Sequence, residues 1–212
     1  MEHFPNMSYG LLGFELFFIS LIVLSSCIIF FRTKEIYQLS EHKGIGFFRK
    51  GFLFFGLAYF FLLLNTIFRS EIYSLHEENI FLFFGLYNIF TFLGTAYLFS
   101  SLYAKKIKEY YLYLFTFVVF LLGFLFHTKL LFSFYSMVLV LLLGFVSIYR
   151  LRGKDKKYFS QIYIIYILFF FSWLVSFLSI VFTRLDLGRI LNVIVLGCAF
   201  LYILYLVVKK LK

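Results

Sequence analysis

The sequence has very little proline, cysteine and acidic charge. Its one proline, Pro5, precedes the first long apolar run, so no proline interrupts a helix further along the chain. The two cysteines, Cys27 and Cys198, lie inside apolar runs, where neither is placed for an external disulfide or a metal cluster. Motifs of fixed spacing for catalysis, a cofactor or a metal, such as His-Glu-x-x-His, are also absent. These absences argue against an enzyme and predict neither a cofactor nor a bound metal.

The apolar residues, by contrast, are too many for a water-soluble domain. Of the 212 residues, 63% are hydrophobic and only 14% are charged, and the mean hydropathy is +0.97. A soluble fold of this size has no interior large enough to hide that surface, whereas a lipid bilayer tolerates it. We attribute the 35 Phe and 17 Tyr to a compositional bias of the lineage and not to an aromatic binding site.

The apolar residues form seven runs, each long enough to cross a hydrocarbon core about 30 Å thick as a helix. Residues in the runs do not alternate between apolar and polar, as the strands of a membrane barrel would. The N-terminus has no positive region, which argues against a cleaved signal peptide. The predicted fold is an all-α, polytopic membrane protein of seven transmembrane helices in a single transmembrane domain over 1–212, a multi-pass protein of the cell membrane. The seven runs cover 9–31, 51–68, 80–103, 110–126, 130–149, 158–182 and 190–208.

The distribution of Lys and Arg predicts the orientation. Sixteen lie in the first, third and fifth connections and the C-terminal tail, and four lie on the other side, at Arg69, Lys129, Arg184 and Arg189. Because basic residues are concentrated in cytoplasmic loops, we expect the N-terminus outside and the C-terminus in the cytoplasm. The same distribution, in short loops between apolar runs, argues against nucleic acid as a partner despite the formal charge of +10.

The longest predicted connection, 32–50, mixes apolar and basic residues. It is expected to lie along the lipid headgroups as an interfacial segment. The alternative is that 32–50, together with the basic connection 150–157, docks a cytoplasmic protein partner.

The third and seventh runs resemble each other. Residues 88–98, followed by 105–108, match 192–201, followed by 209–212, with an Asn, a Leu-Gly-x-Ala core and a Lys pair in each. A duplication would make 9–108 and 130–212 two repeats joined by a linker helix at 110–126. Chance similarity between two apolar helices is the alternative, because the Asn and Lys matches are out of register with the core by one residue.

This arrangement resembles, in architecture, the membrane proteins with three helices, a linker helix and three more. That group includes the SWEET-type sugar transporters, the microbial opsins and the G-protein-coupled receptors. The resemblance implies a substrate site between the two repeats, as in parallel-repeat transporters. The sequence departs from each family's own pattern, since 190–208 contain no Lys for a retinal Schiff base, the repeat helices contain no proline, and the receptor signatures are absent.

Several polar side chains fall inside the apolar runs and share helix faces. Such residues normally face the interior of a helical bundle. They are interpreted as lining a polar cavity between helices 1–3 and 5–7, or alternatively as small and hydroxyl groups that pack helices together. The cavity candidates, besides Glu15, are Asn65, Arg69, Asn88, Ser172, Ser176, Arg189 and Asn192.

Glu15 is the one carboxylate well inside an apolar run, about 9 Å from its outer end. A carboxylate in that environment is expected to be protonated or paired, with Arg69 as the first choice of partner and Arg189 as the second. Glu15 is predicted to be either a substrate or proton site or one half of a structural ion pair.

Two functions are compatible with these features. The first is a small-solute transporter or permease whose solute is unknown and whose polar cavity opens around Glu15. The second is a receptor-like sensor that signals through a separate cytoplasmic partner.

Overall fold

The structure is a computed structural model that describes residues 9–71, 77–102 and 186–211, with isolated residues at 117, 118, 167 and 171. Four helices make up this part of the chain: α1 (Tyr9–Ser40), α2 (Lys43–Glu71), α3 (Glu77–Leu102) and α7 (Asp186–Leu211). The predicted all-helical fold is therefore confirmed for the described residues. The predicted fourth, fifth and sixth spans, and with them the repeat and its linker helix, lie outside the described residues.

Three of these helices, α1, α2 and α3, are long and apolar enough to cross a membrane, and α7 contains a shorter apolar stretch, Val193–Lys209. The outer face of α1 carries five large exposed apolar side chains between Phe14 and Phe31. That interval of seventeen residues measures about 26 Å along a helix, close to the thickness of a bilayer core. An apolar stripe of this length is what a lipid-facing helix needs.

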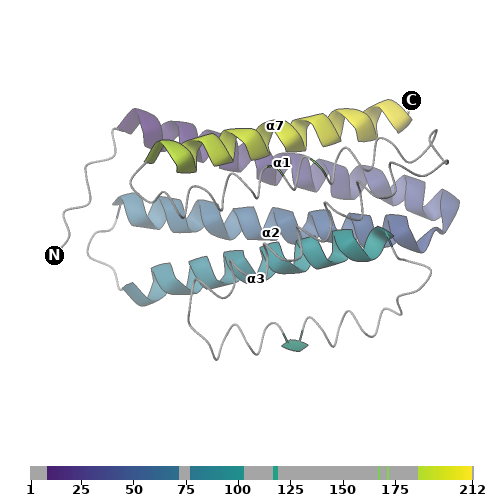
Figure 1. Ribbon diagram of the computed structural model, residues 1–212, viewed down its shortest axis with the longest axis horizontal. Helices are drawn as coiled ribbons and strands as arrows, with labels where there is room; N and C mark the ends of the chain where they lie inside the picture. The colour runs from purple at the N-terminus through teal and green to yellow at the C-terminus, as the bar shows by residue number, and fades with distance from the viewer. Residues whose placement is uncertain are drawn as a thin grey trace.

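The helices lie roughly side by side along the long axis of the molecule (Figure 1). α7 packs against α1, α1 against α2, and α2 against α3. α1, α3 and α7 run in one direction and α2 runs in the other (Figure 1). We call the end of the bundle that holds the start of α1 the Glu15 end, and the opposite end, where α1 passes into α2, the turn end.

The connection between α1 and α2 is much shorter than expected. Residues 32–40 continue α1 and residues 43–50 begin α2, so only Glu41 and His42 form the turn. Glu41 has a φ of 49° and its N–H bonds the carbonyl of Tyr37, which ends α1. The ring Nδ1 of His42 accepts a hydrogen bond from the N–H of Gly44 and caps α2. Residues 32–50 are thus not a connecting loop, because both helices continue past the apolar stripe up to the turn at Glu41 and His42. That 32–50 lies along the headgroups stays a prediction.

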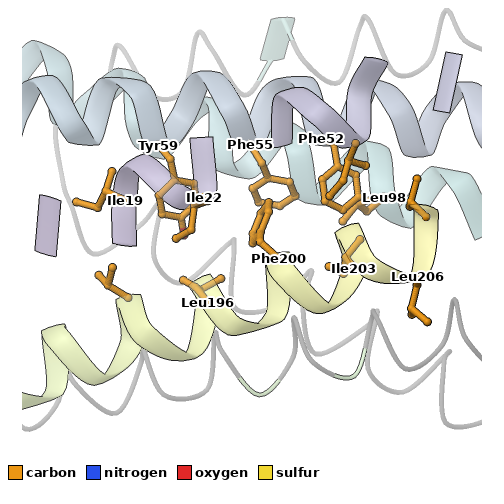
Figure 2. Packing of buried hydrophobic residues seen from close by; sticks show 13 residues of the cluster. Ile19, Ile22, Phe52, Phe55, Tyr59, Leu98, Leu196, Phe200, Ile203 and Leu206 are labelled. Atoms are coloured by element: carbon orange, nitrogen blue, oxygen red, sulfur yellow. The ribbon is translucent and has the colours of Figure 1, made fainter. Parts of the chain in front are cut away.

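The largest apolar cluster lies where α1, α2 and α7 meet. Phe200 of α7 contacts the rings of Phe52, Phe55 and Tyr59 of α2, with centroids 5.6, 6.0 and 6.1 Å apart. Ile19 and other branched side chains of α1 close the same cluster (Figure 2). The cluster fills the space between these three helices from the level of Ile19 down to that of Leu206.

In the contact between α2 and α3, the aromatic side chains recur every seven residues on each helix. Gly51 of α2 lies so close to α3 that an added Cβ would come within 3.1 Å of Leu98 and 3.2 Å of the carbonyl oxygen of Gly94. Beside this close approach the two helices alternate rings in a continuous ladder with centroid separations of 5.1 to 6.3 Å. In order from the Glu15 end, the rings are Phe68, Phe83, Phe61, Phe90, Phe54, Tyr97 and Phe47.

Candidate functional site

Glu15 is almost completely buried, with 2% of its surface exposed. It begins the buried face of α1, which continues through Ile19, Ile22, Ser26 and Ile29 at steps of three or four residues. The apolar cluster therefore starts one helical turn below Glu15, on the same face of α1.

Two glycine contacts show which neighbours this face of α1 meets. Gly56 of α2 approaches Ser26, and Gly197 of α7 approaches Phe18. Successive residues of a helix are rotated by about 100° around its axis. Seen along the axis of α1, the side chain of Glu15 therefore points between those of Ser26 and Phe18. The carboxylate thus stands over the space between α1, α2 and α7, at the Glu15 end of the bundle.

Thr66, which the sequence analysis did not select, shares this depth. Gly56 of α2 and Ser26 of α1 are in contact, and the two helices are antiparallel. Thr66 lies ten residues after Gly56 and Glu15 lies eleven residues before Ser26, so both are at nearly the same distance from that contact along the bundle. Thr66 also lies seven residues after Tyr59, on the side of α2 that meets Phe200 of α7. The side chain is buried and its hydroxyl donates to the carbonyl of Leu62 at 2.9 Å. Glu15 and Thr66 are the buried polar residues at this level of the three-helix contact within the described part of the chain.

Asn65 is equally deep in the bundle but belongs to another contact. It lies fourteen residues after Gly51, hence within about 40° of the side that faces α3. It lies nine residues after Gly56, hence about 180° from the side that faces α1. The side chain is 6% exposed, and its Oδ1 has no hydrogen-bond partner among the described residues. Asn65 and Glu15 are therefore separated onto opposite sides of α2.

Asn88 lies on a third face. Its Nδ2 donates to the carbonyl of Phe84 at 2.9 Å, and the side chain is half-buried. It shares a face with Thr91 and Thr95, as the spacing predicts. Asn88 itself is turned about 120° from Gly94, where α3 meets α2. This polar face of α3 is thus separate from both Asn65 and Glu15.

The remaining cavity candidates have no described side chains. Arg69 lies in the last turn of α2, and Arg189 and Asn192 lie in the first two turns of α7. Ser172 and Ser176 fall outside the described residues. The predicted pairing of Glu15 with an arginine consequently stays a prediction.

Six of the seven buried serine and threonine hydroxyl groups of the described helices bond within their own helix. Each donates to a backbone carbonyl three or four residues earlier, so none needs a ligand to satisfy its donor. This pattern favours packing over a lined cavity for the hydroxyl stripes. The residues are Ser26, Thr33, Thr66, Thr91, Thr95 and Ser100.

Metal chemistry finds no support in the described ranges. They contain no group of three or more His, Cys, Asp or Glu side chains arranged to hold an ion. The two cysteines are exposed and free, one on α1 and one on α7.

Arg49 has a structural role that the count of basic residues did not reveal. Its Nε donates to the backbone carbonyl of Phe30 at 3.0 Å, and its guanidinium lies over the Phe30 ring, 4.1 Å from the centroid. Arg49 thereby joins α2 to α1 near the turn end. The contact follows from the antiparallel pairing of the helices, which no local sequence pattern specifies.

Comparisons with known proteins assign no family to the chain. No family model matches it. A protein of Archaeoglobus fulgidus, described as an uncharacterized protein, is 46% identical over 46 residues, which are 22% of this chain and 20% of that protein. The match thus spans about a fifth of the length of that curated relative. No solved structure matches.

Proposed function

We propose that this chain is a multi-pass protein of the cell membrane that carries a small polar solute, and that Glu15 binds the solute at the outer mouth of the bundle. The proposal keeps the predicted orientation, with the Glu15 end outside and the turn end in the cytoplasm. The solute would be a small molecule or ion with a positive charge or hydrogen-bond donors, because a carboxylate accepts hydrogen bonds and attracts cations.

The observation that supports the proposal most directly is the burial of Glu15 between apolar helices. Burying an ionised carboxylate costs several kcal/mol unless it is paired or hydrogen-bonded. Chains retain such groups in membrane helices chiefly where they serve a pathway or a relay. Thr66 at the same depth adds a second oxygen on the opposite helix.

The apolar cluster beneath Glu15 would act as the barrier of the carrier. The rings of Phe52, Phe55 and Phe200 meet further down the bundle, so packed side chains separate a solute bound at Glu15 from the turn end. Passage would require α7 and α1 to shift against α2. Alternating access in carriers uses such movements of one helix group against another.

The test is uptake of radiolabelled monovalent cations, amines, amino acids and sugars by liposomes that contain the full chain. We expect the wild type to move one of these classes and Glu15→Gln to reduce its rate at least tenfold. Glu35→Gln is the matched control, since Glu35 is exposed on the same helix, and its rate should equal that of the wild type. Wild-type rates in folded Glu15→Gln would refute the role of Glu15, and the absence of transport by the wild type would refute the carrier itself.

A receptor-like sensor is the second candidate, and one observation favours it. α1 and α2 continue as helices beyond the apolar stripe and form a hairpin that presents Leu39, which is 89% exposed. A hairpin of this kind suits docking of a cytoplasmic partner. The sensor predicts that a solute changes the distance between spin labels at positions 39 and 101 without any flux, whereas the carrier predicts flux.

A further inference from the structure

Arg49 presents an oriented guanidinium with donors to spare. Its Nε–H is engaged by the carbonyl of Phe30, and its plane is held over the ring of the same residue. A guanidinium has five N–H donors, so four remain on the two terminal nitrogens. In the described part of the chain, Phe30 supplies both of the contacts that Arg49 makes. Held in this way, Arg49 loses little side-chain freedom on binding an anion.

Arg49 lies at the depth of a lipid headgroup. It contacts α1 next to Phe31, which is 65% exposed and is the last residue of the apolar stripe of α1. On α2, Arg49 and Arg69 are twenty residues apart, which corresponds to about 30 Å, the thickness of the hydrocarbon core. Arg49 is therefore placed where the acyl chains end and the phosphates begin.

A second cation lies on the same side of α1. Lys34 is one helical turn after Phe30 and is exposed. The nearest acidic residue of α1, Glu35, is rotated about 140° from Phe30 around the helix. The contact between α1 and α2 thus carries two positive groups within about one helical turn of each other, without a carboxylate between them among the described residues.

An apolar track leads from Arg49 toward the middle of the membrane. Leu53 lies one turn after Arg49 on α2, and Phe60 lies two turns further on nearly the same face. Both side chains are exposed. This combination of a cationic end and an apolar track fits an anionic phospholipid, with its phosphate at Arg49 and an acyl chain along Leu53 and Phe60.

We propose that Arg49 and Lys34 form a binding site for the headgroup phosphate of an anionic phospholipid in the leaflet at the turn end. The planar guanidinium pairs with two phosphate oxygens, and the ammonium of Lys34 adds a second charge-assisted hydrogen bond. Anionic lipid is favoured over zwitterionic lipid because two cations face one headgroup. The site would join α1 to α2 at the membrane boundary.

The test is binding of phosphatidylglycerol to the full chain in neutral detergent, measured by native mass spectrometry, with phosphatidylcholine and inorganic phosphate as separate arms. We expect phosphatidylglycerol to bind at least tenfold more tightly than phosphatidylcholine, and inorganic phosphate to bind far more weakly than either. Arg49→Gln should reduce the affinity for phosphatidylglycerol about tenfold, and Lys34→Gln about threefold. Lys43→Gln, an exposed lysine at the start of α2, should leave it unchanged.

Three results would overturn the proposal. Equal losses in Arg49→Gln and Lys43→Gln would mean that only overall charge matters. An affinity for phosphatidylglycerol unchanged in Arg49→Gln, with a lower unfolding temperature, would mean that Arg49 only joins α1 to α2. Equal binding of inorganic phosphate and lipid would mean a general anion site. Because Lys34 is exposed, Lys34→Gln keeps the test decisive if Arg49→Gln fails to fold.

Discussion

α2 packs against α3 on one side and against α1 and α7 on the other, and the two contacts use different side chains. Toward α3, the rings of α2 recur at intervals of seven, and the backbones come close at Gly51. Toward α1 and α7, the contact consists of bulky rings and branched side chains, with Glu15 and Thr66 at one end. At Gly51 the backbones of α2 and α3 approach each other, whereas the glycines of the second contact, Gly56 and Gly197, meet side chains.

This difference suggests how the bundle divides if it moves. In lipid, helices associate through van der Waals packing and close backbone approach, because apolar burial alone does not distinguish protein from lipid. The α2–α3 pair has both, and its regular spacing specifies one register. The contact with α1 and α7 depends on rotatable side chains, which can repack. We therefore expect α2 and α3 to behave as one unit, with α7 and α1 as the elements that shift around Glu15.

The largest effect is expected from Phe200→Ala, which removes the ring that joins α7 to α2. Its three ring contacts would be lost, and the cavity should cost about 3 kcal/mol of unfolding free energy. Chemical unfolding in detergent micelles measures this loss. Tyr205→Ala, at an exposed position of the same helix, is the control and should change little. Equal losses in the two variants would mean that the ring cluster does not hold α7 in place.

A somewhat smaller effect is expected from Gly51→Leu at the contact between α2 and α3. The added side chain would meet the backbone of Gly94, which cannot rotate away, so we expect a loss of about 2 kcal/mol. Gly85→Leu on α3 is the matched control, because an added Cβ there meets no atom within 4 Å among the described residues. If Gly51→Leu is tolerated as well as Gly85→Leu, then α2 and α3 are not locked by close backbone approach.

The smallest effect is expected from Ser26→Ala, at the point where α1 meets Gly56. The hydroxyl bonds the carbonyl of Ile22 in its own helix, and alanine keeps the Cβ that packs against α2. The unfolding free energy should change by less than about 0.5 kcal/mol. The transport rate should also be unchanged, in contrast to Glu15→Gln. A large loss of transport would show that hydroxyl groups below Glu15 line the pathway after all.

Much of the architecture was predictable from the order of residues, and some of it was overlooked there. The described residues of the apolar runs at 9–31, 51–68, 80–103 and 190–208 are helical, as expected. The spacing of seven in Phe47, Phe54, Phe61 and Phe68 was also present in the sequence, but it was attributed to composition. The spacing produces a ladder of rings only because residues 83, 90 and 97 of α3 have the same spacing and the two helices pack in register.

The candidate site was less predictable than the helices. Periodicity correctly indicated that Glu15 and Asn65 lie on buried faces, but a helix face does not reveal which neighbour covers it. The contacts of Gly51, Gly56 and Gly197 place Asn65 toward α3 and Glu15 toward α2 and α7. Arg49 was likewise counted only as a topology signal, since its contact with Phe30 joins residues nineteen positions apart.

The sequence by itself determined that the chain is apolar enough for a membrane, that the described apolar runs are helical, and which faces of these helices carry polar residues. Those properties follow from composition and from the 3.6-residue period of the helix, which are local. Only the tertiary structure decided how the helices pair, that 32–50 is a helical hairpin, and that Glu15 and Asn65 belong to different contacts. Pairing depends on the fit of two surfaces distant in the chain, and that fit arises only when both helices are present.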